Sequence, residues 1–209
     1  MSAPVIRALF VVLDGVDGCG KSTQARRLVE ALSRGSNPDP LHVREPGSTP
    51  VGEALRAILL SREHALLTPR VETLLFAAAR AQTLSELVAP ALAAGRHVVC
   101  ERFHPSTFAY QAVAGGLDER EVLTLLETWA GSPRPDLEIV LEIPAELAAR
   151  RRGRATDRIE DKGLGFQQRV ARGYARYKEL VPRTIVIDGA RDEDHVARDI
   201  FAEVQRALR

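Results

Sequence analysis

The chain has 209 residues, of which 45% are hydrophobic, and its formal net charge is +1. This length and composition are sufficient for one domain with its own hydrophobic core. The near-neutral charge argues against a nucleic-acid partner, because proteins that bind DNA or RNA usually carry a clear basic excess. The first residues lack the segments of a signal peptide, and no apolar run approaches the roughly 18 residues of a membrane span. We therefore expect a cytoplasmic protein without a nucleic-acid or membrane partner.

Five short apolar runs alternate with segments whose apolar residues recur at helical spacing. The runs cover residues 9–13, 41–43, 97–100, 137–143 and 184–187. Short apolar runs are typical of strands buried on both faces, and strands that alternate with helices form parallel sheets. The predicted fold class is therefore α/β, with a five-stranded parallel sheet flanked by helices.

Residues 15–22 match the phosphate-binding pattern G-x-x-x-x-G-K-[ST] and stand between the first apolar run and a helix-like segment. Glycines let successive backbone N–H groups point at phosphate oxygens, and the positive end of the helix adds to the attraction. Lys21 is predicted to contact the β- and γ-phosphates of ATP, and Ser22 to ligate Mg²⁺. The predicted nucleotide-binding residues are Gly15, Val16, Asp17, Gly18, Cys19, Gly20, Lys21, Ser22 and Thr23.

The middle of the chain predicts one long helix. Thr68 and Pro69 fit its N-cap and first position, and apolar residues such as Leu74 and Ala78 follow at helical spacing. Proline has no backbone N–H group and clashes with the preceding turn of a helix. Pro90 is therefore predicted to kink this helix or to end it.

A basic segment interrupts the regular pattern between the fourth and fifth apolar runs. Its arginines are Arg150, Arg151, Arg152, Arg154 and Arg158, and glycines follow at positions 163 and 165. A charged loop with hinges can close over phosphates, where guanidinium groups stabilise developing charge and the closed loop excludes water. The alternative is a solvated helix end.

A phosphate loop alone does not define a reaction, since GTPases, motor ATPases and small-molecule kinases all use one. GTPases of the Ras type recognise guanine with an Asn-Lys-x-Asp motif, but the only asparagine here, Asn37, precedes a proline. Glu101 follows a predicted strand, as does the carboxylate that holds Mg²⁺ or activates water in motor ATPases. Arg102 comes next and suits a second, anionic substrate.

These residues resemble the bacterial thymidylate kinase family along nearly the whole chain. The motifs that carry the resemblance are the loop at residues 14–23, Arg-Glu-Pro-Gly at 44–47, Phe-Ala-Ala-Ala-Arg at 76–80, Glu-Arg-Phe at 101–103 with Ser106 and Ala-Tyr-Gln at 109–111, and Asp-Arg-Ile-Glu at 157–160. The resemblance implies a P-loop kinase fold that transfers the γ-phosphoryl group of ATP to dTMP with Mg²⁺. It also implies one P-loop kinase domain over residues 1–209, with a lid at about 150–165, and a homodimer.

The resemblance assigns an acceptor site. Arg44 and Arg102 would clamp the acceptor phosphate. Phe76 would stack on the thymine ring, and Arg80, one helical turn later, would donate to a base carbonyl. The remaining predicted acceptor residues are Ser106 within the Glu-Arg-Phe motif region, Gln111 at another edge of the base, Tyr110 as a filter against a ribose 2′-hydroxyl, and Asp17 at the sugar 3′-hydroxyl.

Departures from the family pattern affect the predicted catalytic residues. Glu101 replaces the usual aspartate before the arginine, and the phosphate loop carries Gly18 and Cys19 where some members have a catalytic arginine. The compensating charge would then come from the lid. The predicted catalytic residues are Lys21, Asp17, Glu101, Arg102, Arg152 and Arg154, with Ser22 and Glu101 as the predicted metal ligands. The family also has a cis peptide bond before the proline that corresponds to Pro46.

Two other functions are consistent with the same motifs. The first is another nucleoside monophosphate kinase, or a deoxynucleoside kinase, of the same fold. The second is a nucleotide-dependent switch that hydrolyses slowly and signals through lid closure. A switch would hydrolyse ATP without an acceptor, whereas a kinase turns over only when an acceptor is present.

Overall fold

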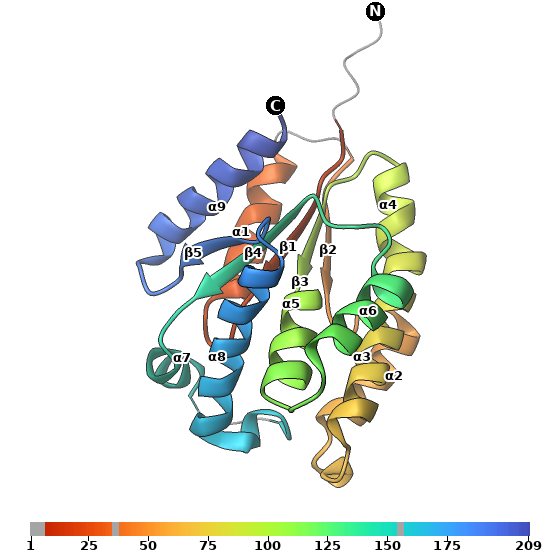
Figure 1. The fold of residues 1–209 in the computed structure, drawn as a ribbon. Coiled ribbons are helices and arrows are strands. Elements are labelled where there is room, and N and C mark those ends of the chain that lie inside the picture. Colours follow the sequence, from red (N-terminus) through yellow and green to blue (C-terminus); the bar gives the residue numbers. More distant parts are fainter. Residues whose placement is uncertain (1–6, 35–37, 154–156) are drawn as a thin grey trace, which may run out of the picture.

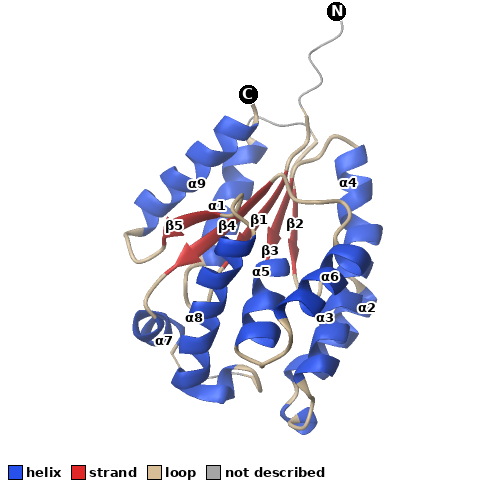
Figure 2. Cartoon of the chain, in the orientation of Figure 1, coloured by secondary structure: helices blue, strands red, loops and turns tan. Residues whose placement is uncertain are grey.

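A computed structural model describes residues 7–34, 38–153 and 157–209 of the chain. Within these residues, five strands form one parallel sheet in the order β2-β3-β1-β4-β5, with helices on both faces (Figures 1 and 2). The strands are β1 Phe10–Asp14, β2 Leu41–Arg44, β3 Val98–Glu101, β4 Leu137–Glu142 and β5 Ile185–Asp188. The predicted fold class is confirmed, and every strand lies within or next to a predicted apolar run.

Helices connect the parallel strands. The α-helices are α1 Lys21–Ser33, α2 Pro50–Leu60, α3 Pro69–Thr83, α4 Ala89–Ala93, α5 His104–Thr107, α6 Glu119–Ala130, α7 Ala145–Arg152, α8 Gly163–Leu180 and α9 Glu193–Ala207. Shorter turns are the 3₁₀-helical η1 Arg62–His64 and η4 Glu160–Lys162 and the π-helical η2 Leu84–Val88 and η3 Phe108–Val113. No helix in the described ranges is both long and apolar enough to cross a membrane.

The central strand β1 is buried over its whole length. Alternate side chains of a strand point to opposite faces of the sheet. Phe10 accordingly belongs to a hydrophobic cluster with Leu84 of η2, whereas Val11 belongs to the larger cluster that includes Leu28 of α1 and Ile200 of α9. Burial on both faces explains why the strand is apolar without alternation.

The long helix predicted from Thr68 continues beyond Pro90. The Thr68 hydroxyl accepts a hydrogen bond from the backbone N–H of Val71 (3.4 Å) and caps α3, as predicted. The π-helical turn η2 then leads into α4, where Pro90 occupies the first turn. The backbone N–H of Ala89 bonds to the carbonyl oxygen of Leu84, five residues earlier, so the helix is already wound more widely where the proline, which has no N–H to donate, follows. The helix therefore does not end at Pro90, contrary to one of the two expectations: the helical path changes to a π-helical turn before the proline and runs on to Ala93.

The basic segment is only partly a loop. Arg150, Arg151 and Arg152 form the last turn of α7, and the chain resumes as η4 and α8. Arg154 lies outside the described residues. Basic side chains in the last turn of a helix are favourable, since they face the negative end of the helix dipole. The start of this segment is therefore a solvated helix end, as in the alternative interpretation, and residues 157–162 contact the end of α2 and α3.

Candidate active site

The phosphate loop lies at the carboxyl edge of the sheet, between β1 and α1. Gly15, Gly18 and Gly20 have φ angles of 139°, 88° and 95°, which L side chains rarely adopt. A Cβ atom at Gly15 would lie 2.5 Å from the carbonyl oxygen of Leu141, and one at Gly18 would lie 2.3 Å from that of Ala148. Glycine is therefore required at both positions by backbone angle and by space.

The loop curls around the Lys21 side chain at the start of α1. Its Nζ donates to the carbonyl oxygen of Val16 (3.3 Å) and lies 3.5 Å from a carboxylate oxygen of Asp17. A hollow beside the loop is lined by Gly18, Cys19, Gly20, Lys21, Ser22 and Thr23, together with Arg151, Arg191 and other residues near the start of α9. This arrangement of backbone N–H groups and one ammonium group fits a polyphosphate.

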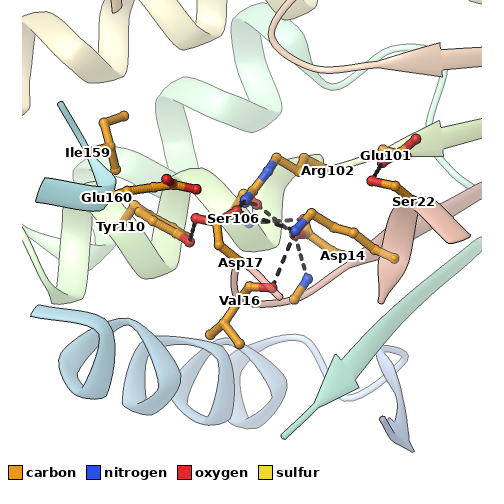
Figure 3. A network of polar contacts seen from close by, with 12 residues as sticks. Asp14, Val16, Asp17, Ser22, Glu101, Arg102, Ser106, Tyr110, Ile159 and Glu160 are labelled. Atoms are coloured by element: carbon orange, nitrogen blue, oxygen red, sulfur yellow. Dashed lines mark hydrogen bonds and ion pairs between the residues drawn. The ribbon is translucent and has the colours of Figure 1, made fainter. Parts of the chain in front are cut away.

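Ser22 and Glu101 lie together at the phosphate loop (Figure 3). The Ser22 hydroxyl donates to Oε2 of Glu101, and Nε2 of His42 lies 2.9 Å from Oε1. Burial raises the pKa of Glu101, but the hydrogen bonds from His42 and Ser22 outweigh it, so the pKa lies below its usual value. The longer side chain of glutamate thus reaches the serine hydroxyl.

This pair fits Mg²⁺. Magnesium is usually held in proteins by one or two carboxylates and a hydroxyl, and completes its coordination with water and substrate phosphates. The described part of the chain has no group of three or more His, Cys, Asp and Glu side chains that would form an all-protein metal cage. The donor set at Ser22 and Glu101 is therefore that of a nucleotide-associated Mg²⁺ ion.

A second cavity of about 200 Å³ lies next to the loop. It is lined by Asp17, Glu45, Pro46, Arg56, Leu60, Phe76, Arg80, Arg102, Ser106, Thr107, Tyr110, Gln111, Asp157, Ile159 and Glu160. All the predicted acceptor residues except Arg44 are in this set. Arg44 ends β2, beside Glu101 in the sheet, but its side chain is exposed and forms an ion pair with Glu53 (3.2 Å). Arg56 of α2, which the sequence analysis did not identify, lines the cavity instead.

Arg102 and Asp17 form the boundary between the two sites. Nη2 of Arg102 pairs with Asp17, and Nη1 donates to the Ser106 hydroxyl (2.9 Å). The Tyr110 hydroxyl donates to the other carboxylate oxygen of Asp17 (2.9 Å; Figure 3). Burial by itself would raise the pKa of Asp17. The positive charges of Arg102 and Lys21 and the hydrogen bond from Tyr110 together lower it by more, so the pKa lies well below its usual range.

Asp14, the last residue of β1, holds Ser106 of this cavity in place, although sequence reasoning gave it no separate role. Its buried carboxylate accepts hydrogen bonds from the Ser106 hydroxyl (2.6 Å), the Tyr174 hydroxyl (2.9 Å) and the backbone N–H of Phe103 (2.9 Å). The signal in the sequence was a carboxylate at the end of an apolar strand. Asp14 thereby fixes the start of α5 against the phosphate loop.

Arg80 lines the cavity, and most of its guanidinium group is bonded to the protein. Its Nε donates to Glu45, and its Nη2 donates to the carbonyl oxygen of Phe103 (3.0 Å) and the hydroxyl of Thr107 (3.1 Å). Nη1 is buried and has no hydrogen-bond partner among the residues that the structure describes. Phe76 lies one turn earlier on α3 and lines the same cavity. Arg80 thus has one buried donor available for a ligand.

Glu45, which sequence reasoning did not single out, precedes a cis peptide bond to Pro46, as the family resemblance implied. Burial raises the pKa of Glu45 to about 7, and the neighbouring Arg80 opposes that rise. Like Nη1 of Arg80, Oε1 of Glu45 is buried without a partner in the described part of the chain. The two side chains form a buried pair that faces the cavity.

The arginines of the basic segment have different environments. Arg151 donates to the carbonyl oxygens of Gly189 (2.7 Å) and Ala190 (3.1 Å), so it joins α7 to the loop after β5. Arg158 is buried, and its guanidinium group is bonded to Leu59 and to a carboxylate on α3. Arg152 is half-buried, and its Nε has no hydrogen-bond partner among the described residues. Its backbone nitrogen would lie 3.2 Å from a Cβ atom at Gly18, beside the phosphate loop.

A glycine-rich loop at the carboxyl edge of a parallel sheet, with an arginine-lined cavity against it, defines the class of P-loop phosphotransferases that act on a second, anionic substrate. Comparisons with known proteins define the family. The sequence model of the family described as thymidylate kinase matches residues 13–200. The chain belongs to the thymidylate kinase family.

Individual relatives agree along nearly the whole chain. A thymidylate kinase of Symbiobacterium thermophilum is 40% identical over 203 residues, which are 96% of this chain and 94% of the relative. A thymidylate kinase of Dinoroseobacter shibae is 42% identical over 199 residues, which are 93% and 95% of the two chains. The crystal structure of thymidylate kinase from Ehrlichia chaffeensis superposes with a TM-score of 0.77 at 26% identity, over 95% of this chain and 98% of the other.

Proposed function

We propose that the chain transfers the γ-phosphoryl group of ATP to dTMP, giving dTDP and ADP. The observation that carries this proposal is the position of Asp17. It belongs to the phosphate loop and also lines the second cavity, so a donor phosphate and an acceptor would meet at this residue. Holding two polyanions side by side is the main task of a phosphoryl-transfer enzyme.

The phosphate loop is the donor site in this proposal. Backbone N–H groups of residues 15–23 surround the phosphates, and Lys21 binds the β- and γ-phosphates. Ser22 and Glu101 would hold Mg²⁺, which offsets charge on the transferred group when it is bound. The hydrogen bond between these two side chains supports this assignment, because it places both oxygen donors at the start of α1.

The second cavity is the acceptor site. Arg102 binds the acceptor phosphate, while Phe76 stacks on thymine and Arg80 donates to a base carbonyl through its free Nη1. Gln111 binds another edge of the base, and Ser106 keeps Arg102 in place. The hydrogen bond from Tyr110 to Asp17 brings the two side chains together, which supports their joint contact with the sugar: Tyr110 would exclude a ribose 2′-hydroxyl and Asp17 would contact the 3′-hydroxyl. Arg44, outside the cavity wall, would reach the phosphate only from the rim.

No general base is required, since the acceptor phosphate oxygen is already a nucleophile. The protein contributes positioning and charge stabilisation. Arg152, with its unpartnered Nε beside Gly18, is the lid arginine whose geometry best supports a catalytic role. Arg154 remains the second candidate. Arg158 is excluded from this role by its bonds to Leu59 and α3.

The same family assignment supports three further proposals, which concern the domain, the cellular location and the oligomeric state. Residues 1–209 form one P-loop kinase domain whose lid is at about 150–165. The protein acts in the cytoplasm. It forms a homodimer through exposed apolar side chains at Val51 and Ile58 of α2 and at Val71 and Leu74 of α3.

The test is ADP formation from magnesium ATP with dTMP, dUMP, ribosyl TMP, AMP, GMP, CMP or no acceptor, on one purified preparation. We expect strong preference for dTMP and negligible turnover without an acceptor. Preference for a different monophosphate would retain the donor site and overturn the base site. ADP formation that does not depend on an acceptor would instead support a nucleotide-dependent switch.

A further inference from the structure

Glu72 of α3 is a buried carboxylate that does not line either site. Only 1% of its surface is exposed, yet it accepts hydrogen bonds from three side chains. Nε2 of Gln111 donates to Oε2 (3.0 Å), and Nη1 of Arg158 donates to Oε1 (2.6 Å). Nζ of Lys162 lies 3.1 Å from Oε1 and 3.4 Å from Oε2. A buried charge with this many hydrogen-bond partners is held in one position by them.

The carboxylate determines the orientation of the Gln111 amide. Burial raises the pKa of Glu72, but the bonds from Gln111, Arg158 and Lys162 outweigh it, so the pKa lies below its usual value. An ionised carboxylate accepts hydrogen bonds and donates none. Gln111 must therefore turn its NH₂ group toward Glu72, which leaves its carbonyl oxygen as the group available to a ligand in the cavity that Gln111 lines.

The same carboxylate holds the segment that covers the cavity. Asp157, Ile159 and Glu160 line the cavity, whereas Arg158 between them points away into the protein. Its Nε and Nη2 donate to the carbonyl oxygen of Leu59 (3.1 and 2.8 Å), and its Nη1 binds Glu72. Residues 157–160 are thereby fastened to the same group that orients Gln111.

We propose that Glu72 is a positioning residue for base selection: it presents the Gln111 carbonyl oxygen to the base and fastens residues 157–160 over it. The inference rests on the proposed use of the cavity for the acceptor base. A hydrogen-bond acceptor at Gln111 and a donor at Arg80 select a base with a ring N–H group next to a carbonyl group. Thymine and uracil have this pattern.

Cytosine has the opposite pattern. Its ring nitrogen is an acceptor and its exocyclic amino group is a donor, so both would face a group of the same kind. Buried polar groups that are left unpaired carry a large free-energy penalty, which is how a site of this kind rejects a near-isosteric ligand. Rejection of dCMP therefore depends on the Gln111 amide staying in one orientation.

The test replaces Glu72 by glutamine, which has the same size but can donate as well as accept. In Glu72→Gln the Gln111 amide can turn over and Arg158 loses its anionic partner. We expect the ratio of the dissociation constants of dCMP and dTMP, measured by calorimetry without ATP, to fall by about 10-fold or more, since a charge-assisted hydrogen bond is lost. The KM for ATP should stay within about 3-fold of the parent value, as expected for a change confined to acceptor binding.

A double-mutant cycle separates positioning from general weakening of the fold. If Glu72 acts through Gln111, adding Gln111→Ala to Glu72→Gln changes the dCMP to dTMP ratio by less than the sum of the single effects. Lys162→Gln, which removes another partner of Glu72 at a partly exposed position, should also lower the dCMP to dTMP ratio. This variant replaces Glu72→Gln in the test if Glu72→Gln does not fold. Glu119→Gln, which removes an exposed partner of Arg176, is the matched control.

The parent protein tests the proposed function, and the variants test the role of Glu72. A parent protein without preference for dTMP over dCMP contradicts the proposed function and this inference with it. With that preference established, an unchanged ratio in the folded Glu72→Gln and Lys162→Gln variants, or additive effects in the cycle, overturns the role of Glu72 alone.

Discussion

At the residue scale, the main feature of this site is that one carboxylate lines the second cavity and also contacts the lysine of the phosphate loop. Asp17 accepts from Arg102 and Tyr110 on the acceptor side and lies 3.5 Å from Lys21 on the donor side. The pKa of Asp17 lies well below its usual range, so at neutral pH it is ionised and can offset the two cations before any phosphate binds. The binding of phosphates would then release these cations from Asp17.

Arg152 gives a kinetic prediction at this scale. We expect Arg152→Ala to lower kcat by about 100-fold or more, because a guanidinium group that meets charge mainly in the transition state contributes mainly to the rate. The KM for dTMP should change by less than about 3-fold. Steady-state kinetics with Arg176→Ala as an exposed control measures both constants. Equal losses in rate and in affinity would show that Arg152 binds the ground state instead.

At the scale of elements, the helical segment after β3 contributes four side chains to the second cavity. Ser106, Thr107, Tyr110 and Gln111 recur at helical spacing, and all four line the cavity. The α-helical turn α5 passes into the π-helical turn η3 between them. π-Helical turns often occur at functional sites because they shift side chains around the helix axis. Asp14 holds the first turn, and Glu72 holds the last residue of the set.

Strand β4 contains a buried carboxylate away from the active site. Glu138 is 3% exposed, receives a hydrogen bond from the Tyr177 hydroxyl (3.3 Å) and lies 4.0 Å from Nε of Arg183. Burial raises its pKa to about 7, and Arg183 opposes the rise. A carboxyl group whose pKa is raised by folding binds its proton more tightly in the folded state. The stability that the protonated Glu138 side chain contributes is therefore fully present below pH 4.5, and it is lost as the pH rises through about 7.

This linkage predicts the effect of Glu138→Gln on stability. The difference in free energy of unfolding between Glu138→Gln and the parent should rise by about 1–3 kcal/mol from pH 5 to pH 8, because only the parent must ionise a buried group. Urea denaturation at the two pH values measures it, and Glu142→Gln, at the exposed end of the same strand, is the control. A difference that does not change with pH would mean that Glu138 ionises freely in the folded protein.

At the scale of the whole molecule, two exposed apolar stripes lie on adjacent helices. Val51, Ala54 and Ile58 follow one face of α2, and Val71, Leu74 and Ala78 follow one face of α3. The helices α2 and α3 pack together on one side of the sheet (Figure 1). Contiguous exposed apolar surface usually marks a binding surface. A surface of this kind suits the homodimer proposed above, because a two-fold axis brings the same patch of each copy together.

The dimer proposal has a direct test. We expect Leu74→Glu to convert a dimer into a monomer, because the new charge would lose its solvation in an apolar interface. Size-exclusion chromatography with light scattering reports the mass, and Leu180→Glu, at another exposed leucine on α8, is the control. A parent protein that elutes as a monomer would contradict the proposal directly.

The sequence by itself determined the sheet and the phosphate loop. Buried strands are apolar in contiguous runs, and a phosphate loop binds through the backbone of consecutive residues, so both leave a local signal. It also identified the cavity residues Phe76, Arg80 and Arg102 through the family resemblance. The effect of Pro90 on its helix could not be predicted from the sequence, because a π-helical turn that accommodates a proline has no sequence pattern of its own.

Only the tertiary structure decided which charges are available for chemistry. Arg152 and Arg158 look alike in the sequence, but Arg158 is bonded to Glu72, 86 residues away, and Arg152 is left beside the phosphate loop. Arg80 likewise has its Nε bonded to Glu45, 35 residues earlier, while its Nη1 has no hydrogen-bond partner among the described residues. A buried ion pair forms only when the fold brings its partners together in a place that excludes water. The function of a charged side chain therefore depends on distant residues, whereas that of the phosphate loop depends on adjacent ones.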